Sequence, residues 1–285
     1  METLYRLARG GILPRLLVGA LVAFFLYAGM TERDAVKTGS AGVARVAYAR
    51  PVDFAGGADH TDRLIELAKT DHLQLLRWAL DNYETHIRDY TARFHKQERI
   101  KGKLRDRELI DVSFREAPFS VLMTWRENAG RVDKLLYVEG SNDGQMIVHP
   151  TGLFSWISSV KRDPRGDEAY ASSLRTCDQF GFCRTMESLL EVYEQAQERG
   201  ELETAYLGET LVDGRPCVAM ERVLPPDKGY PYARIVIEID TKYLVPVATA
   251  CYDWRGQLIS RYAYHEIVFN QGLTPEQFTP GANGF

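Results

Sequence analysis

The hydrophobic pattern along the chain begins with the period of a helix and then changes to that of strands. Over residues 59–87 apolar side chains recur at steps of three and four, which predicts a helix, with a break near Thr70-Asp71. Asp59 or Thr61 is a suitable cap for its start. Beyond residue 88 the period becomes two, so that strands follow the helix.

The first group of strands is a meander. Residues 109–115 and 119–125 alternate apolar and polar positions, and Pro118 separates them, as expected for a residue confined to edges and turns. Ser141-Asn142-Asp143-Gly144 is a strong hairpin turn. The strands predicted in this group are 90–100, 109–115, 119–125, 134–139 and 145–150.

A second group of elements follows an irregular stretch over residues 151–184. A helix is predicted to begin at Thr185 and to end before Gly200. Five more strands are predicted at 203–212, 216–224, 233–240, 245–254 and 258–270. About ten successive strands with two helices predict an α+β fold, in which one large curved antiparallel sheet forms a half-open β-barrel and the helices cover its concave face.

The N-terminus has the pattern of an export signal. Three arginines precede residues 16–30, LLVGALVAFFLYAGM, which carry no charge. These fifteen residues fit the core of a signal peptide better than a membrane span, which needs about 20. A cleaved signal peptide, an uncleaved N-terminal membrane anchor and a buried helix remain open. The first two both place the body in the periplasm, free or tethered to the inner membrane.

The domain organisation follows from these segments. Residues 1–30 are the signal peptide or anchor, residues 31–58 a flexible tether, and residues 59–285 a single half-barrel domain. The chain has a net charge of −4, and its first 30 residues carry +2, which leaves −6 for the remainder. A net acidic body argues against nucleic acid as a partner, because that binding depends on clustered Lys and Arg.

The four cysteines allow three pairings in an oxidising compartment. Cys177 and Cys183 enclose a short loop, and we expect them to form a disulfide. Cys217 and Cys251 lie in different predicted strands, where they fit a second disulfide or serve as small buried apolar residues. No metal-binding spacing is present among the cysteines and the six histidines, and no metal or cofactor is expected.

No motif of a catalytic site is found. The chain lacks a Gly-rich phosphate loop, a GxSxG elbow and an HExxH sequence. The best candidates for a binding site are Arg115 and the alternating stripe of Phe119, Val121, Met123 and Trp125. Arg115 is suited to hold a ligand headgroup, or else pairs with Glu116, Glu98 or Glu139. The stripe is plain core, or a ligand surface if the helices leave a cavity above it.

Three segments carry a resemblance to a known family. They are FHKQERIKGKL (94–104), FREAPFSVLMTW (114–125) and LYVEGSNDGQMIVHP (136–150). Over residues 90–270 the chain resembles the bacterial envelope proteins known as domain of unknown function 1571, a family without a known activity.

A weaker resemblance concerns residues 244–278, which are similar to the last strands of the periplasmic lipoprotein-carrier superfamily. Pro246 opens a strand, Asp253 and Gly256 form a D-x-x-G turn, and Phe269 and Phe278 belong to the closing F-N-x-x-L-x-x-x-x-F pattern. This resemblance implies a half-open barrel with helices over an apolar cavity, and an arginine-aromatic region on early strands that holds acyl chains.

The sequence therefore leads to two hypotheses. In the first, the protein is a non-enzymatic cell-envelope protein that binds a lipid, an acyl chain or a lipoprotein in the half-barrel cavity. In the second, it is a membrane-anchored envelope sensor or protein-interaction module without a lipid ligand. A filled interior favours the second hypothesis.

Overall fold

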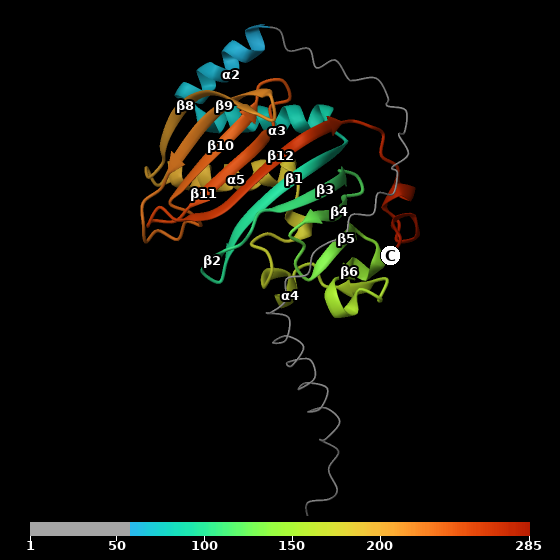
Figure 1. Cartoon of the computed structure of the whole chain (residues 1–285). Helices are drawn as coiled ribbons and strands as arrows, with labels where there is room; N and C mark the ends of the chain where they lie inside the picture. Colours follow the sequence, from blue (N-terminus) through green and yellow to red (C-terminus); the bar gives the residue numbers. More distant parts are fainter. Residues whose placement is uncertain (1–57) are drawn as a thin grey trace, which may run out of the picture. The chain divides into compact units, whose positions relative to one another are not determined.

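One antiparallel sheet dominates the structure, a computed structural model that describes residues 58–285 (Figure 1). Its strand order is β7-β6-β5-β4-β3-β1-β12-β11-β10-β9-β8, and the short β2 pairs with β1. The strands are β1 (Asp89–Ile100), β2 (Lys103–Leu104), β3 (Glu108–Arg115), β4 (Ser120–Glu127), β5 (Val132–Val138), β6 (Met146–Pro150), β7 (Val160–Arg162), β8 (Glu203–Val212), β9 (Arg215–Val223), β10 (Arg234–Asp240), β11 (Pro246–Tyr252) and β12 (Leu258–Phe269).

The two predicted meanders are confirmed, and the sheet joins them in its centre. The ten predicted strands are all present, while β2 and the three-residue β7 were not predicted. β1 pairs with β12, the last strand, over the register from Tyr90–Phe269 to Glu98–Ser260. The first and last strands of the described chain are therefore neighbours, with one meander on either side. The predicted signal peptide or anchor lies outside the described residues, and so does the predicted tether except for Ala58, which begins a helix.

The first predicted helix is two helices, α2 (Ala58–Thr70) and α3 (His72–His86). The break falls at Asp71, as expected, because its side chain accepts a hydrogen bond from the backbone amide of Gln74 at 2.9 Å and caps α3. α5 (Phe182–Glu198) begins three residues before the predicted Thr185, and α4 (Asp167–Tyr170) was not predicted. α4 is too short to give a hydrophobic period.

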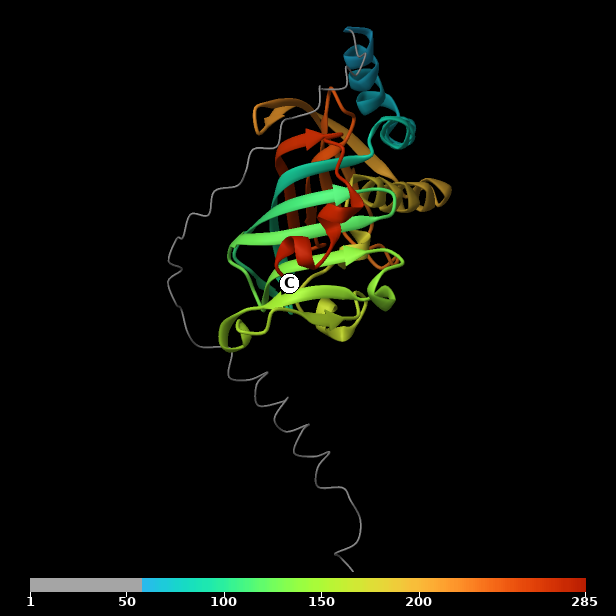
Figure 2. The ribbon, with the colours of Figure 1, turned by 90° about the vertical axis from the view of Figure 1, so that its right-hand side faces the viewer.

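The helices and the C-terminal segment cover opposite faces of the curved sheet (Figure 2). The main core lies between α2, α3 and α5 and one face of the sheet, which we call the inner face. Leu136, Ile147 and Phe278 form a smaller core on the outer face, where the C-terminal segment packs against β5 and β6. Asp89 fixes the start of this segment by accepting a hydrogen bond from the backbone amide of Gln271 at 2.6 Å.

Candidate functional site

The inner face of β1, β3 and β4 forms an apolar floor. Each of its side chains is at most 7% exposed, so the floor belongs to the main core. The floor consists of Phe94, Phe114, Phe119, Val121 and Met123.

Four of the five residues predicted from sequence lie on this face. Phe119, Val121 and Met123 are in the floor, and Trp125 is half-buried at its end. The indole Nε1 of Trp125 donates a hydrogen bond to Glu108 Oε2 at 2.6 Å. The structure therefore brings the stripe together, but as packed core.

Arg115 is not part of this group. Side chains alternate along a strand, and Phe114 points to the inner face, so its neighbour Arg115 lies on the outer face. Its Nη1 is buried without a hydrogen-bond partner. Glu116, one of the partners expected for Arg115, instead accepts a hydrogen bond from Tyr83 Oη at 2.5 Å.

An irregular segment covers the floor. We call residues 171–181, between α4 and α5, the strap. The ring of Phe180 lies 5.2 Å from that of Phe94 and 6.0 Å from that of Phe114, measured between centroids. Gly181 has φ 108°, and a Cβ there would lie 3.0 Å from Phe114 Cζ. Only glycine permits this backbone conformation and this close approach to the floor.

The disulfide predicted between Cys177 and Cys183 is absent from the structure, where both are free thiols. Cys177 points into the core, and its Sγ lies 3.8 Å from Met146 Sδ. Cys183 is only half-buried at the start of α5. Burial raises the pKa of each thiol to about 12, so both stay protonated at neutral pH. Cys217 and Cys251 are also free and buried, in agreement with their interpretation as small apolar residues.

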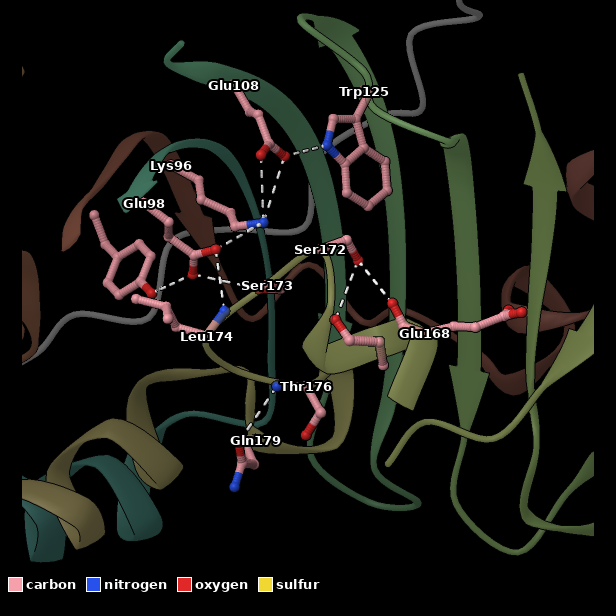
Figure 3. Close-up of polar contacts among 12 residues, drawn as sticks. Lys96, Glu98, Glu108, Trp125, Glu168, Ser172, Ser173, Leu174, Thr176 and Gln179 are labelled. Carbon is pink, nitrogen blue, oxygen red and sulfur yellow. Dashed lines mark hydrogen bonds and ion pairs between the residues drawn. The ribbon is translucent and has the colours of Figure 1, made fainter. Parts of the chain in front are cut away.

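A buried carboxylate anchors the strap to the sheet (Figure 3). Glu98 on β1 is 2% exposed and accepts hydrogen bonds from Ser173 Oγ at 3.3 Å and from the amide of Leu174 at 3.2 Å. Tyr262 Oη donates to the same carboxylate at 2.5 Å. Burial and the neighbouring Glu98 raise the pKa of Tyr262 well above its ordinary value, so the phenol remains a donor.

Lys96 connects this anchor to the end of the floor. Its Nζ lies 3.4 Å from Glu98 Oε2 and 3.4 Å from Glu108 Oε1, and Glu108 also holds Trp125 (Figure 3). One ammonium thus serves two carboxylates in a site where few side-chain atoms reach solvent. These groups already satisfy one another, so the arrangement fixes the strap and leaves no acid or base free for chemistry.

The pocket beside the strap is small and polar. It has a volume of about 250 Å³, below the roughly 300–1,000 Å³ of typical ligand sites. Arg165 and Asp178 cross it with an ion pair of 2.6 Å. It is lined by Phe119, Tyr137, Glu139, Arg165, Asp178, Gln179 and Arg184.

A second buried polar group lies where α3, α5 and β9 meet, and it was missed from the sequence. Arg222 on β9, Tyr193 on α5 and His72 on α3 are 1%, 0% and 4% exposed. The guanidinium carbon of Arg222 lies 4.9 Å from the ring centroid of Tyr193, whose ring lies 6.1 Å from that of His72. The signal for this group was Arg222 itself, which occupies an inward position after Val218 and Met220 on β9.

Residues 58–285 contain no cluster of three or more His, Cys, Asp or Glu side chains arranged to hold a metal ion. In the same residues, no helix has the length and hydropathy needed to cross a membrane.

The fold and site define a half-open antiparallel β-barrel whose apolar inner face is covered by helices and a strap. The chain belongs to the family described as protein of unknown function DUF1571, whose model matches residues 87–284. This confirms the family resemblance found in the sequence. A comparison with curated proteins finds no match.

Solved structures with a similar fold include three bacterial proteins. A putative outer membrane lipoprotein-sorting protein domain from Vibrio parahaemolyticus is 12% identical, with 75% of this chain and 98% of that chain covered and a TM-score of 0.36. Lipoprotein LppX from Mycobacterium tuberculosis is 16% identical, with 71% and 96% covered and a TM-score of 0.41. The complex structure of Pseudomonas aeruginosa MucA/MucB is 15% identical, with 79% of this chain and 62% of that chain covered and a TM-score of 0.41. Similarity at this level carries no argument about function.

Proposed function

We propose that this protein is a non-enzymatic cell-envelope protein that binds a lipid, an acyl chain or a lipoprotein inside its half-barrel. The observation that carries the proposal is the cover of the apolar floor. The floor is sealed by the strap, an irregular segment, rather than by a second sheet. Glu98 holds the strap through two hydrogen bonds, from Ser173 and Leu174. Displacement of the strap exposes a continuous surface of phenylalanine and methionine side chains.

The energetics favour exchange of the strap for an acyl chain. Burial of the chain stabilises the complex by about 0.8 kcal/mol per methylene group, so eight methylenes contribute roughly 6 kcal/mol. Withdrawing Phe180 from the floor costs about 1.5–3 kcal/mol. Each hydrogen bond from the strap to the Glu98 carboxylate adds about 1.5–3 kcal/mol to that cost. A chain of ten or more methylenes therefore competes with the strap.

The proposed location follows from the sequence of the leader. The uncharged residues 16–30 after three arginines direct the body to the periplasm, where a retained leader tethers it to the inner membrane. A lipid-binding domain in the periplasm, tethered to the inner membrane, lies close to membrane lipids.

The second candidate function is an envelope sensor or protein-interaction module without a lipid ligand. The filled interior favours it, since α5 and the strap occupy the space above the floor and the pocket beside the strap holds only about 250 Å³. In this case the strap is a permanent part of the core and a partner binds the outer surface.

One experiment separates the two functions. Full-length protein, matured by the expressing cell, is purified from the envelope and analysed by native mass spectrometry and by displacement of a fluorescent acyl probe. The variant Phe180→Ala removes the plug from the floor and is expected to raise probe affinity about tenfold, the effect of about 1.4 kcal/mol. Leu207→Ala, on the exposed face of β8, is the control and leaves affinity unchanged.

Either result has a definite meaning. A co-purified acyl species, together with tighter probe binding by Phe180→Ala, supports lipid binding. A ligand-free mass and no probe binding by the parent or by Phe180→Ala would refute it and leave the interaction module.

A further inference from the structure

Three neighbouring buried side chains contain polar atoms without partners. These atoms are Nε and Nη1 of Arg222, Oη of Tyr193 and Nδ1 of His72. The other ring nitrogen of His72 lies 2.8 Å from the carbonyl oxygen of Ala68 and is therefore occupied. Buried polar groups are nearly always hydrogen-bonded, so three such residues in one chain of contacts require an explanation.

Of these three residues, Arg222 has the least compensated side chain, because it carries a buried charge. Its guanidinium is charged at every physiological pH and is almost completely removed from water. The groups that surround it, Tyr193, Tyr230, Tyr232 and Cys251, are neutral at pH 7. Burial lowers the pKa of Arg222, which reflects the lack of compensation for the charge.

The face of the Tyr193 ring compensates part of this charge. A cation over an aromatic face is stabilised by about 2 kcal/mol when desolvated, less than the several kcal/mol lost on burying an ion. A water molecule can satisfy the donors, but it cannot neutralise the charge. An anion does both, and a guanidinium binds carboxylate or phosphate oxygens through paired N–H donors.

We infer that Arg222, together with Tyr193, binds the anionic headgroup of the ligand, a carboxylate or a phosphate monoester. The inference rests on the proposed function, in which the acyl chain of the same ligand lies along the inner face of the sheet. Arg222 provides the charge and two donors, and Tyr193 Oη provides a third donor. His72 lies one contact further, beside the ring of Tyr193, and its Nε2 is bound to the carbonyl oxygen of Ala68.

The cover of this site is α5. Tyr193 lies over the guanidinium, so the headgroup reaches Arg222 only when α5 moves away from β9. Arg77 on α3 and Glu194 on α5 form an ion pair of 2.8 Å, which couples the two helices.

The test compares headgroups on one acyl chain. Full-length protein is titrated with dodecanoate, dodecyl phosphate and dodecanol below their micelle concentrations, and inorganic phosphate is titrated separately. The parent is expected to bind the two anions at least tenfold more tightly than the alcohol. Arg222→Gln abolishes this preference and leaves alcohol affinity unchanged. Arg261→Gln, an exposed arginine on β12, is the matched control and keeps the preference.

A second variant guards against loss of folding. Tyr193→Phe keeps the ring over Arg222 and removes only the hydroxyl, so it preserves packing, and it is expected to weaken the anions severalfold and not the alcohol. Equal affinity of the parent for all three ligands overturns the headgroup site while the proposed function stands. No binding of any of them overturns the proposed function. Binding of inorganic phosphate alone, lost in Arg222→Gln, overturns the headgroup assignment in favour of a free-anion site.

Discussion

Replacing Glu98 by glutamine removes the charge that anchors the strap while keeping the shape of the side chain. The native carboxylate accepts hydrogen bonds from Tyr262, Ser173 and the amide of Leu174, and it lies 3.4 Å from the ammonium of Lys96. In Glu98→Gln one oxygen becomes an NH₂ group, which cannot accept from the amide of Leu174. Lys96 then retains Glu108 as its only carboxylate partner.

The magnitude follows from the burial of this group. Glu98 is 2% exposed, so water does not replace the lost contacts. Removing one partner of a buried ion pair destabilises a protein by about 3–5 kcal/mol. Because Glu108 remains near Lys96, we expect the lower end, about 3 kcal/mol in the free energy of unfolding. Most of this loss is localised, because Ser173 and Leu174 lose their link to the sheet.

Two measurements check the prediction. Urea denaturation gives the change in the free energy of unfolding, and hydrogen exchange reports the opening of residues 171–181. Asp143→Asn breaks an exposed ion pair with Lys161 on the surface and serves as the control, with a change below about 1 kcal/mol. If Glu98→Gln unfolds within 1 kcal/mol of the parent and exchange in the strap is unchanged, the anchoring role of Glu98 is wrong.

Three further predictions concern other parts of the molecule. Gly181→Ala is expected to destabilise the protein by about 2–4 kcal/mol in urea denaturation, because φ is 108° and the new Cβ meets Phe114. The control Gly256→Ala, at φ 72° in open space, is expected to lose about 1 kcal/mol. Equal losses in the two variants would contradict the contact with Phe114. Phe278→Ala is expected to lose about 3–5 kcal/mol and to release the C-terminal segment from the outer face, as limited proteolysis would detect. Burial and the stacked ring of His265, 4.1 Å away, lower the pKa of His95 below 6.5, so the unfolded state binds more protons and stability falls as pH drops through and below 6.5. His95→Gln makes this decline shallower, which thermal melts between pH 7.5 and 5 measure, and an unchanged slope would refute the assignment.

The fold was predictable because its strands have a regular period. The alternation of Ile110, Val112 and Phe114 identifies β3 and its buried face, and Asp71 marks the helix break. The strap and α4 have no period that a sequence pattern can detect. The strap takes its conformation from the packing of Phe180 on the floor and from the hydrogen bonds of Ser173 and Leu174 to Glu98, and these contacts join residues distant in sequence.

The candidate site was predictable in its apolar part and missed in its polar part. Phe119, Val121 and Met123 point inward as their alternation required, whereas Arg115 was assigned to the same site although its position in β3 places it on the opposite face. Glu98 and Arg222 are charged residues at inward positions of their strands. Charged residues are usually exposed, so the sequence alone does not show that Glu98 and Arg222 are buried. Their burial depends on residues of the strap and of α5, which are distant in sequence.

The pairing of β1 with β12 also has a consequence for biosynthesis. The central ladder of the sheet joins segments about 170 residues apart, so β1 lacks one neighbour until nearly the whole chain has been made. Native contacts of such long sequence separation form slowly, and β1 presents an open edge while it waits. The chain cannot complete its sheet before its final strand is made, so pairing of β12 with β1 is the step that commits the chain to the folded state.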